Sequence, residues 1–239
     1  MPHDHAAPAS DADTRRLGVA VALNLGLTLA QLIGGVLAGS LALVADALHN
    51  LSDAVSLLVA LVARRVARRP ADARMTFGYG RIEAVAALVN STTLAVLGLW
   101  LLAEAGRRAL DPAPVEGWTV IALAALALAV DAATAALTAR GARGSVNIRA
   151  AFLHNLGDAL ASLAVIVSGA LILLYDWRLA DPLATVLVSG MILAMAWSAG
   201  REAAGVLMLG APAALDAAEV ARDLARLPGV AGLHHVHLW

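Results

Sequence analysis

Long apolar runs separated by short polar segments dominate the pattern of this chain. A helix needs about 20 mainly apolar residues to cross the hydrocarbon core of a bilayer, and six runs have about that length. They cover residues 17–37, 41–63, 84–103, 118–139, 146–175 and 181–198. Turn-forming segments such as Asp111–Pro114 separate them. The pattern predicts an all-α integral membrane protein, with six transmembrane helices in a domain of residues 15–210.

The composition supports the membrane class. Hydrophobic residues make up 60% of the chain and charged residues 15%, which is far from the usage of soluble domains. Cysteine is absent, which excludes disulfides, thiolate metal sites and cysteine nucleophiles. The formal net charge of −1 gives no reason to expect nucleic acid as a partner. Residues 1–14 are polar and unlike the basic start of a signal peptide, so we expect a disordered cytoplasmic tail there.

Arginines indicate how the spans are oriented. A cluster of them at residues 64–69 follows the second run, and such a cluster in a short loop is typical of the cytoplasmic side. Six spans with this loop inside put both termini in the cytoplasm, as expected for a multi-pass protein of the cell (inner) membrane. Three arginines on the opposite side do not fit the rule: Arg107, Arg108 and Arg178.

One seven-residue pattern occurs twice inside the apolar runs. Residues 48–54 are Leu-His-Asn-Leu-Ser-Asp-Ala, and residues 153–159 are Leu-His-Asn-Leu-Gly-Asp-Ala. Ionisable residues inside a membrane are costly and indicate a functional site. In each copy the histidine and the aspartate are four residues apart, which puts them on one face of a helix. Two imidazoles and two carboxylates suit a divalent transition metal, with tetrahedral Zn²⁺ as the first candidate.

The two copies are expected to meet near the middle of the bilayer. The second and fifth runs cross in opposite directions, and each histidine lies about 12 Å, and each aspartate about 18 Å, along its run. His49 then comes level with Asp158, and Asp53 with His154. We therefore predict one shared metal site. The alternative is that each histidine only forms a hydrogen bond to a neighbouring helix.

Other polar residues inside the spans leave two interpretations open. Asp46 and Asp131 could line a proton or ion path, or could pair with polar neighbours, and the sequence favours neither. Asn24, Thr28 and Gln31 recur at helical spacing along the first run, which predicts a buried polar stripe. Interhelical hydrogen bonds explain such a stripe as well as a pathway lining does.

After the sixth run the chain takes on soluble character. Asp216 and Glu219 form a capping-box-like start, which predicts a short amphipathic helix that ends before Pro228. Residues 230–239 alternate in polarity and predict a strand. One helix and one strand cannot bury a core, so we expect residues 211–239 to be the beginning of a truncated cytoplasmic C-terminal domain.

Three segments resemble the cation diffusion facilitator family of zinc-transporter-type cation efflux proteins. They are Gly-Ser-Leu-Ala-Leu-Val-Ala-Asp-Ala-Leu-His-Asn-Leu-Ser-Asp at 39–53, Phe-Gly-Tyr-Gly-Arg-Ile-Glu at 77–83 and Phe-Leu-His-Asn-Leu-Gly-Asp at 152–158. The resemblance covers nearly the whole chain. Four residues match the family's transport-site positions: His49, Asp53, His154 and Asp158. A histidine at the first of these positions resembles the zinc-preferring subgroup.

The resemblance implies proton-coupled export of metal from the cytoplasm by homodimers, with a ferredoxin-like α+β cytoplasmic domain that senses metal. Some relatives bind a second metal in the loop after the second span. Met75 and Tyr79 stand where histidines would hold it, and Asp72 alone remains, so we expect that site to be absent. His234 matches a regulatory metal position of some relatives.

Three kinds of function fit an intramembrane metal site. A catalytic zinc usually keeps one position open for water, whereas four ligands close the shell here, which disfavours a membrane-embedded metalloenzyme. A metal-stabilised structural membrane protein stays an alternative. We expect a secondary transporter and not an enzyme, one that exchanges Zn²⁺ for protons across the lipid bilayer by alternating access. Cd²⁺, Co²⁺ and Fe²⁺ are further candidate substrates.

Overall fold

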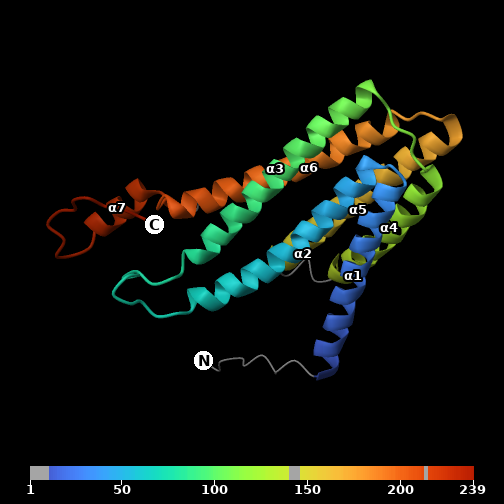
Figure 1. The fold of residues 1–239 in the computed structure, drawn as a ribbon. Coiled ribbons are helices and arrows are strands. Elements are labelled where there is room, and N and C mark those ends of the chain that lie inside the picture. The colour runs from blue at the N-terminus through green and yellow to red at the C-terminus, as the bar shows by residue number, and fades with distance from the viewer. Residues whose placement is uncertain (1–10, 140–145, 213–214) are drawn as a thin grey trace. The chain divides into compact units, whose positions relative to one another are not determined.

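A computed structural model describes residues 11–139, 146–212 and 215–239, with side chains described from residue 24 onward except at 137–151. The described chain forms seven helices (Figure 1): α1 (Asp11–Leu37), α2 (Leu41–Ala67), α3 (Ile82–Leu110), α4 (Gly117–Ala139), α5 (Val146–Tyr175), α6 (Ala180–Leu207) and α7 (Ala217–Ala225). The first six coincide with the six apolar runs. α1 already begins at Asp11, inside the tail predicted to be disordered, and residues 1–10 lie outside the described part of the chain.

Five helices are long and apolar enough to cross a membrane. These are α2 to α6. The part of α1 with described side chains, Asn24–Leu37, is apolar but shorter than a span. An all-helical membrane domain is therefore confirmed for five spans, and the sixth stays a prediction.

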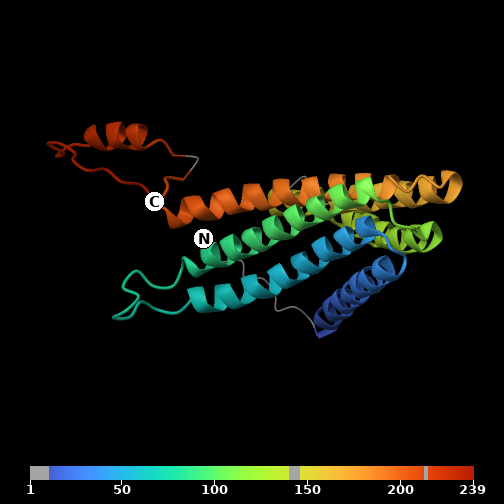
Figure 2. The same cartoon turned by 45° about the horizontal axis from the view of Figure 1, so that its top comes forward.

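The chain divides into two compact units, one of residues 1–54 and 98–191 and the other of residues 55–97 and 192–239. In the first unit, α4 lies along α5, as Figures 1 and 2 both show. Glycines permit this close approach: a Cβ on Gly169 of α5 would lie 3.1 Å from the backbone oxygen of Gly117 in α4. Small residues at such a crossing let two membrane helices pack backbone to backbone.

In the second unit, α3 contacts α2 and α6. The hydroxyl of Ser56 in α2 donates to Asn90 Oδ1 of α3 at 2.6 Å. On the side of α6, a Cβ on Gly200 would lie 3.3 Å from the side chain of Ser91 in α3. Both figures show α3 and α6 running beside each other.

The loop between α2 and α3 is organised by one aspartate. Both oxygens of the Asp72 carboxylate accept hydrogen bonds: Oδ1 from the backbone N–H groups of Arg74 and Met75, and Oδ2 from the Tyr79 hydroxyl at 2.6 Å. The Tyr79 hydroxyl, followed by the two N–H groups, lowers the pKa of Asp72, and the same contact raises the pKa of Tyr79. These bonds fold the loop upon itself.

The N-terminus of α2 is held by a carboxylate from far along the chain. Ser40 precedes the helix, and its hydroxyl accepts a hydrogen bond from the N–H of Leu43 at 3.1 Å, as an N-cap residue does. The same hydroxyl donates to Asp181 at 2.5 Å, and the N–H groups of Leu41 and Ala42 donate to that carboxylate at 2.8 and 3.3 Å. Asp181 is only 1% exposed. Its carboxylate satisfies helix-start N–H groups that have no partner within α2.

The three arginines that break the charge rule all lie in ion pairs. Arg107 and Arg108 both contact the Glu104 carboxylate, at 2.6 and 3.2 Å. Arg178 contacts Asp176 at 3.0 Å. Each of these positive charges therefore has an acidic neighbour within ion-pair distance.

The C-terminal segment is only partly as predicted. The short helix is confirmed: Asp216 caps α7, accepting from the N–H of Ala218 at 2.9 Å, and the helix ends at Ala225. The predicted strand is wrong, because residues 230–239 are irregular. An alternating pattern specifies a strand only where a second strand pairs with its backbone, and the described residues contain no such partner. The ferredoxin-like domain therefore stays a prediction.

Candidate metal centre

Helices α2 and α5 supply the candidate ligands as two pairs. Within α2, Nε2 of His49 lies 3.6 Å from Oδ2 of Asp53. Within α5, Nε2 of His154 lies 3.4 Å from Oδ2 of Asp158. In both cases the spacing of four residues brings the two side chains to the same face, one turn apart.

The pairs also meet across the two helices. His49 Nε2 lies 3.2 Å from Asp158 Oδ1, and His154 Nε2 lies 3.2 Å from Asp53 Oδ2. These are the two partnerships that the helical rise predicts to share a level. All four side chains belong to the same compact unit.

The spacing of these atoms suits a four-coordinate ion. Each histidine Nε2 lies 3.2–3.6 Å from an oxygen of both aspartates. Ligand atoms bound to zinc at about 2.0–2.1 Å stand about 3.3 Å apart in a tetrahedron. Ligand atoms of His49, Asp53 and Asp158 all lie within 4.8 Å of one another. His154 is outside that group, and the two imidazole centroids are 6.1 Å apart, so a full tetrahedron requires the His154 ring to move toward His49.

The four ligands differ in accessibility. The side chains of His49 and Asp158 are 6% and 10% exposed, whereas those of Asp53 and His154 are 28% and 38% exposed. The cluster therefore has a closed side, made by His49 and Asp158, and an open side, made by Asp53 and His154. An ion would enter past the open side.

Asp46 and Asp131, the two acids whose role the sequence leaves open, both have polar partners. Asp46 is fully buried, and its Oδ2 accepts from Gln31 Nε2 at 2.9 Å and lies 3.4 Å from the Ser162 hydroxyl. That hydroxyl also lies 3.4 Å from Asp131 Oδ2. Asp46, Gln31, Ser162 and Asp131 thus form one polar network, contributed by four helices.

The predicted polar stripe of α1 is confirmed in part. Thr28 and Gln31 are buried, but Asn24 is exposed. Two residues of these contacts, Ser162 and Asp181, carry no clear signal in the sequence. Ser162 resembles an ordinary small packing residue. Asp181 resembles a residue that begins its own helix, although its carboxylate accepts hydrogen bonds from the start of α2.

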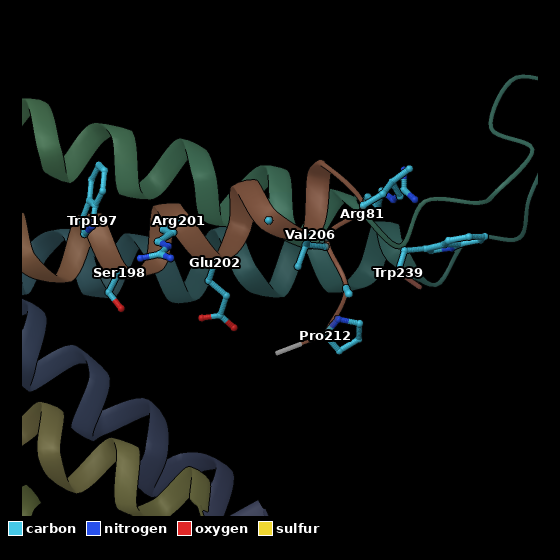
Figure 3. A pocket seen from close by; sticks show the side chains of 12 residues that line it. Arg81, Trp197, Ser198, Arg201, Glu202, Val206, Pro212 and Trp239 are labelled. Carbon is cyan, nitrogen blue, oxygen red and sulfur yellow. The ribbon is translucent and has the colours of Figure 1, made fainter. Parts of the chain in front are cut away.

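His234 and a cavity in the second unit lie outside the candidate centre. His234 is exposed, and among the described residues His49, Asp53 and Asp158 form the group that could hold a metal. The cavity, of about 820 Å³, is bounded by Trp197 at one end and by Arg81 and Trp239 at the other (Figure 3). Its lining has a single carboxylate and no histidine, so it does not suit a transition metal.

Comparison with known proteins decides the family. Residues 17–208 match the family model described as the cation efflux transmembrane domain. The chain belongs to the cation efflux family. The match covers all six apolar runs, and so includes both halves of the candidate metal centre in this cation efflux protein.

Relatives of this cation efflux protein align over essentially its whole length. "Zinc transporter ZitB" of Escherichia coli (strain K12) is 40% identical over 245 residues, which cover 100% of this chain and 78% of the relative. "Cadmium, cobalt and zinc/H(+)-K(+) antiporter" of Bacillus subtilis (strain 168) is 32% identical over 241 residues, covering 100% and 76%. "Metal cation efflux system protein CzcD" of Cupriavidus metallidurans is 34% identical over 237 residues, covering 99% and 74%.

Family membership settles the class of activity. Cation efflux proteins are membrane transporters, so this protein is a transporter of metal cations and not an enzyme. The prediction of a transporter is confirmed, and the metalloenzyme alternative is excluded.

Proposed function

We propose that this cation efflux protein exports Zn²⁺ from the cytoplasm in exchange for protons, through a site made by His49, Asp53, His154 and Asp158. One observation carries the proposal. The Nε2 atom of each histidine lies within 3.6 Å of an oxygen of both aspartates, which is close to the nitrogen–oxygen distance between two ligands of a tetrahedral ion. Zinc is named in two of the relatives above, and cadmium, cobalt and antiport with H⁺ and K⁺ in one of them.

The donor set explains why a divalent ion can be held at this depth. Two carboxylates supply two negative charges, which balance the charge of Zn²⁺, and two neutral imidazoles complete the shell. Without that balance, a double charge among apolar helices would be strongly disfavoured. The same nitrogen and oxygen donors accept Co²⁺, Cd²⁺ and Fe²⁺, and a shell of four such ligands favours zinc among them.

The exposure of the ligands favours a site that opens toward the cytoplasm. If the arginine cluster at residues 64–69 is cytoplasmic, α2 runs inward and α5 runs outward. Asp53 and His154 are then the ligands nearer the cytoplasm, and they are also the more exposed pair. His49 and Asp158, nearer the outside, are closed off. This arrangement corresponds to the stage of alternating access at which the site loads metal from the cytoplasm.

Protons and metal compete for the same side chains. A histidine binds metal only when neutral, and a carboxylate binds best when ionised, so metal binding releases protons. The unperturbed pKa of histidine, about 6.5, puts this competition near physiological pH. At the outward-open stage, protons from a more acidic exterior displace the metal from the ligands and accompany the empty carrier back.

The remaining features of the proposal concern assembly. We expect six spans in the inner membrane, both termini in the cytoplasm, and a homodimer whose cytoplasmic C-terminal domain carries His234 as a regulatory metal ligand. Substituted-cysteine labelling from each side of the membrane tests the topology directly, because the natural chain has no cysteine. Light scattering of the purified protein measures its oligomeric state.

Transport in sealed vesicles tests the central claim. Purified protein is reconstituted with a pH dye inside, and zinc flux is followed with and without an imposed pH gradient. We expect zinc to move against protons and the dye to report the proton flux. Asp53→Ala is the matched control and should abolish both signals. Zinc flux that ignores the gradient and leaves the dye unchanged would mean that the protein is a uniporter or a channel.

A further inference from the structure

One buried hydrogen bond near the metal centre has an unpaired oxygen on each side. Asp46 lies three residues before His49 on α2, and both Asp46 and Gln31 are 0% exposed. Gln31 Nε2 donates to Asp46 Oδ2 at 2.9 Å. The other oxygen of each group, Asp46 Oδ1 and Gln31 Oε1, has no hydrogen-bond partner among the described residues. Buried polar atoms of this kind are rare and need an explanation.

A proton on Asp46 would turn one of these two acceptors into a donor. An ionised carboxylate only accepts hydrogen bonds, and an amide oxygen also only accepts, so neither atom can serve the other. When Asp46 is protonated on Oδ1, that oxygen becomes a hydrogen-bond donor. Gln31 Oε1 is an acceptor without a partner, and it belongs to the same amide that already donates to Asp46 Oδ2. The acid form of Asp46 therefore supplies a donor where the ionised form has only buried acceptors without partners.

A second acid makes the ionised state of Asp46 still less favourable. The Ser162 hydroxyl lies 3.4 Å from Asp46 Oδ2 and 3.4 Å from Asp131 Oδ2. It has one hydrogen and can donate to only one of the two carboxylates at a time. Two carboxylates joined by one hydroxyl in apolar surroundings disfavour simultaneous ionisation, because like charges repel and burial removes their hydration.

We propose that Asp46 and Asp131, bridged by Ser162, hold one proton in the metal-free protein and release it when metal binds between α2 and α5. This inference rests on the proposed function. It adds a proton site whose residues are not metal ligands, so that part of the coupling is electrostatic and does not come from protons on the ligands themselves.

The charged and titratable groups around the pair explain the direction of the coupling. Asp46 is faced by Asp131 of α4, by Asp158 of α5 and by His49 of its own helix, and Asp131 is also faced by His154. Without metal, the nearby acids favour a proton on the pair. A bound Zn²⁺ adds two positive charges beside them, which favours the ionised pair, and the proton leaves to solvent. When the metal leaves, the proton returns.

Counting the protons released on zinc binding tests the proposal without any transport step. The full chain in lipid nanodiscs is titrated with zinc by calorimetry, in two buffers of different ionisation enthalpy, and the difference in heat gives the number of protons released. Asp46→Asn mimics the acid form but cannot lose a proton. We expect it to bind zinc and to release about one proton fewer per zinc than the wild type. Its apparent zinc affinity should also rise less steeply with pH.

Two further variants keep the test decisive. Asp131 is less buried than Asp46, so Asp131→Asn provides the same comparison if Asp46→Asn does not fold. Asp176→Asn removes an acid that pairs with Arg178 and should leave the count unchanged. Equal proton counts in the wild type and both variants would overturn the proposal. The proposal would also be overturned if the heat of zinc binding depended on the K⁺ concentration at fixed pH, because Asp46 and Asp131 would then hold a metal cation.

Failure of the proposed function gives a different result. Asp53→Ala removes a proposed ligand and leaves the Asp46 network intact. If Asp53→Ala bound zinc as the wild type does, the ligand set itself would be wrong, whatever the proton counts of the other variants.

Discussion

Replacing Asp181 by asparagine should destabilise the protein although the residue is not a ligand. The carboxylate of Asp181 accepts three hydrogen bonds at the start of α2, from the Ser40 hydroxyl and from the N–H groups of Leu41 and Ala42. Asparagine has almost the same shape but only one acceptor oxygen and no charge. The change therefore removes acceptors and leaves the size of the side chain nearly constant.

The magnitude follows from the three bonds. Hydrogen bonds to a charged group contribute about 1.5–3 kcal/mol each, and neutral ones about 0.5–1.5 kcal/mol. Asp181→Asn loses the bond from Leu41, which reaches the second carboxylate oxygen, and converts the other two into neutral bonds. The lower desolvation cost of an amide offsets part of that loss. We expect the free energy of unfolding to fall by about 2–4 kcal/mol. The melting temperature should then fall by roughly 4–16 °C.

Thermal unfolding in detergent, followed by circular dichroism, measures this effect. Asp176→Asn is the matched control, because Asp176 lies five residues away, is exposed, and should change the melting temperature very little. Asp181→Ala should be at least as damaging as Asp181→Asn, since it removes every acceptor. If both Asp181 variants had the melting temperature of the wild type, the start of α2 would not depend on this carboxylate.

Four further predictions concern the metal centre, the α2–α3 loop and the α4–α5 contact. Alanine at any one of the four candidate ligands should abolish zinc uptake while the protein still folds and inserts: His49, Asp53, His154 and Asp158. Near-normal uptake in any two of these variants would rule out a shared site. His49→Asp should broaden selectivity, because it replaces a borderline-soft nitrogen by a hard, charged oxygen; unchanged ratios of zinc to cadmium and manganese in competition would refute this. Tyr79→Phe should raise the pKa of Asp72 toward its ordinary value, since it removes the largest cause of the lowering; NMR titration of the carboxyl carbon measures it. Gly169→Val should slow or abolish transport by forcing α5 away from α4, whereas Gly190→Ala, in open space, should not.

Most of the fold could be predicted from the sequence because a membrane helix is recognised from the apolar residues of its own segment. Apolar runs bounded by arginines, prolines and glycines gave helix limits close to the observed ones, for example 118–139 against Gly117–Ala139 for α4. The partnership of His49 with Asp158 also followed from local rules. It needs only the helical rise and the opposite directions of α2 and α5.

The features that the sequence did not predict depend on contacts between distant residues. Asp181 stands beside a proline at a helix start, and nothing local indicates that its carboxylate lies against Ser40, 141 residues earlier. Ser162 has no signal of its own, because serine is common in apolar helices, and its role comes from lying between two acids. The strand at residues 230–239 failed for a related reason, since alternation without a partner strand does not fix a backbone.

The contact between Asp181 and the start of α2 also has a consequence for the order in which the chain folds during synthesis. Leu41 emerges from the ribosome 140 residues before the carboxylate that accepts from its N–H. At about 5–20 residues per second, that donor waits roughly 7–28 s for its partner. Until α6 enters the membrane, the N–H groups in the first turn of α2 lack this acceptor. His49 lies about two turns further along the same helix. The helix that carries His49 and Asp53 therefore gains this cap only when α6 arrives, although α6 contributes no ligand to the candidate metal centre.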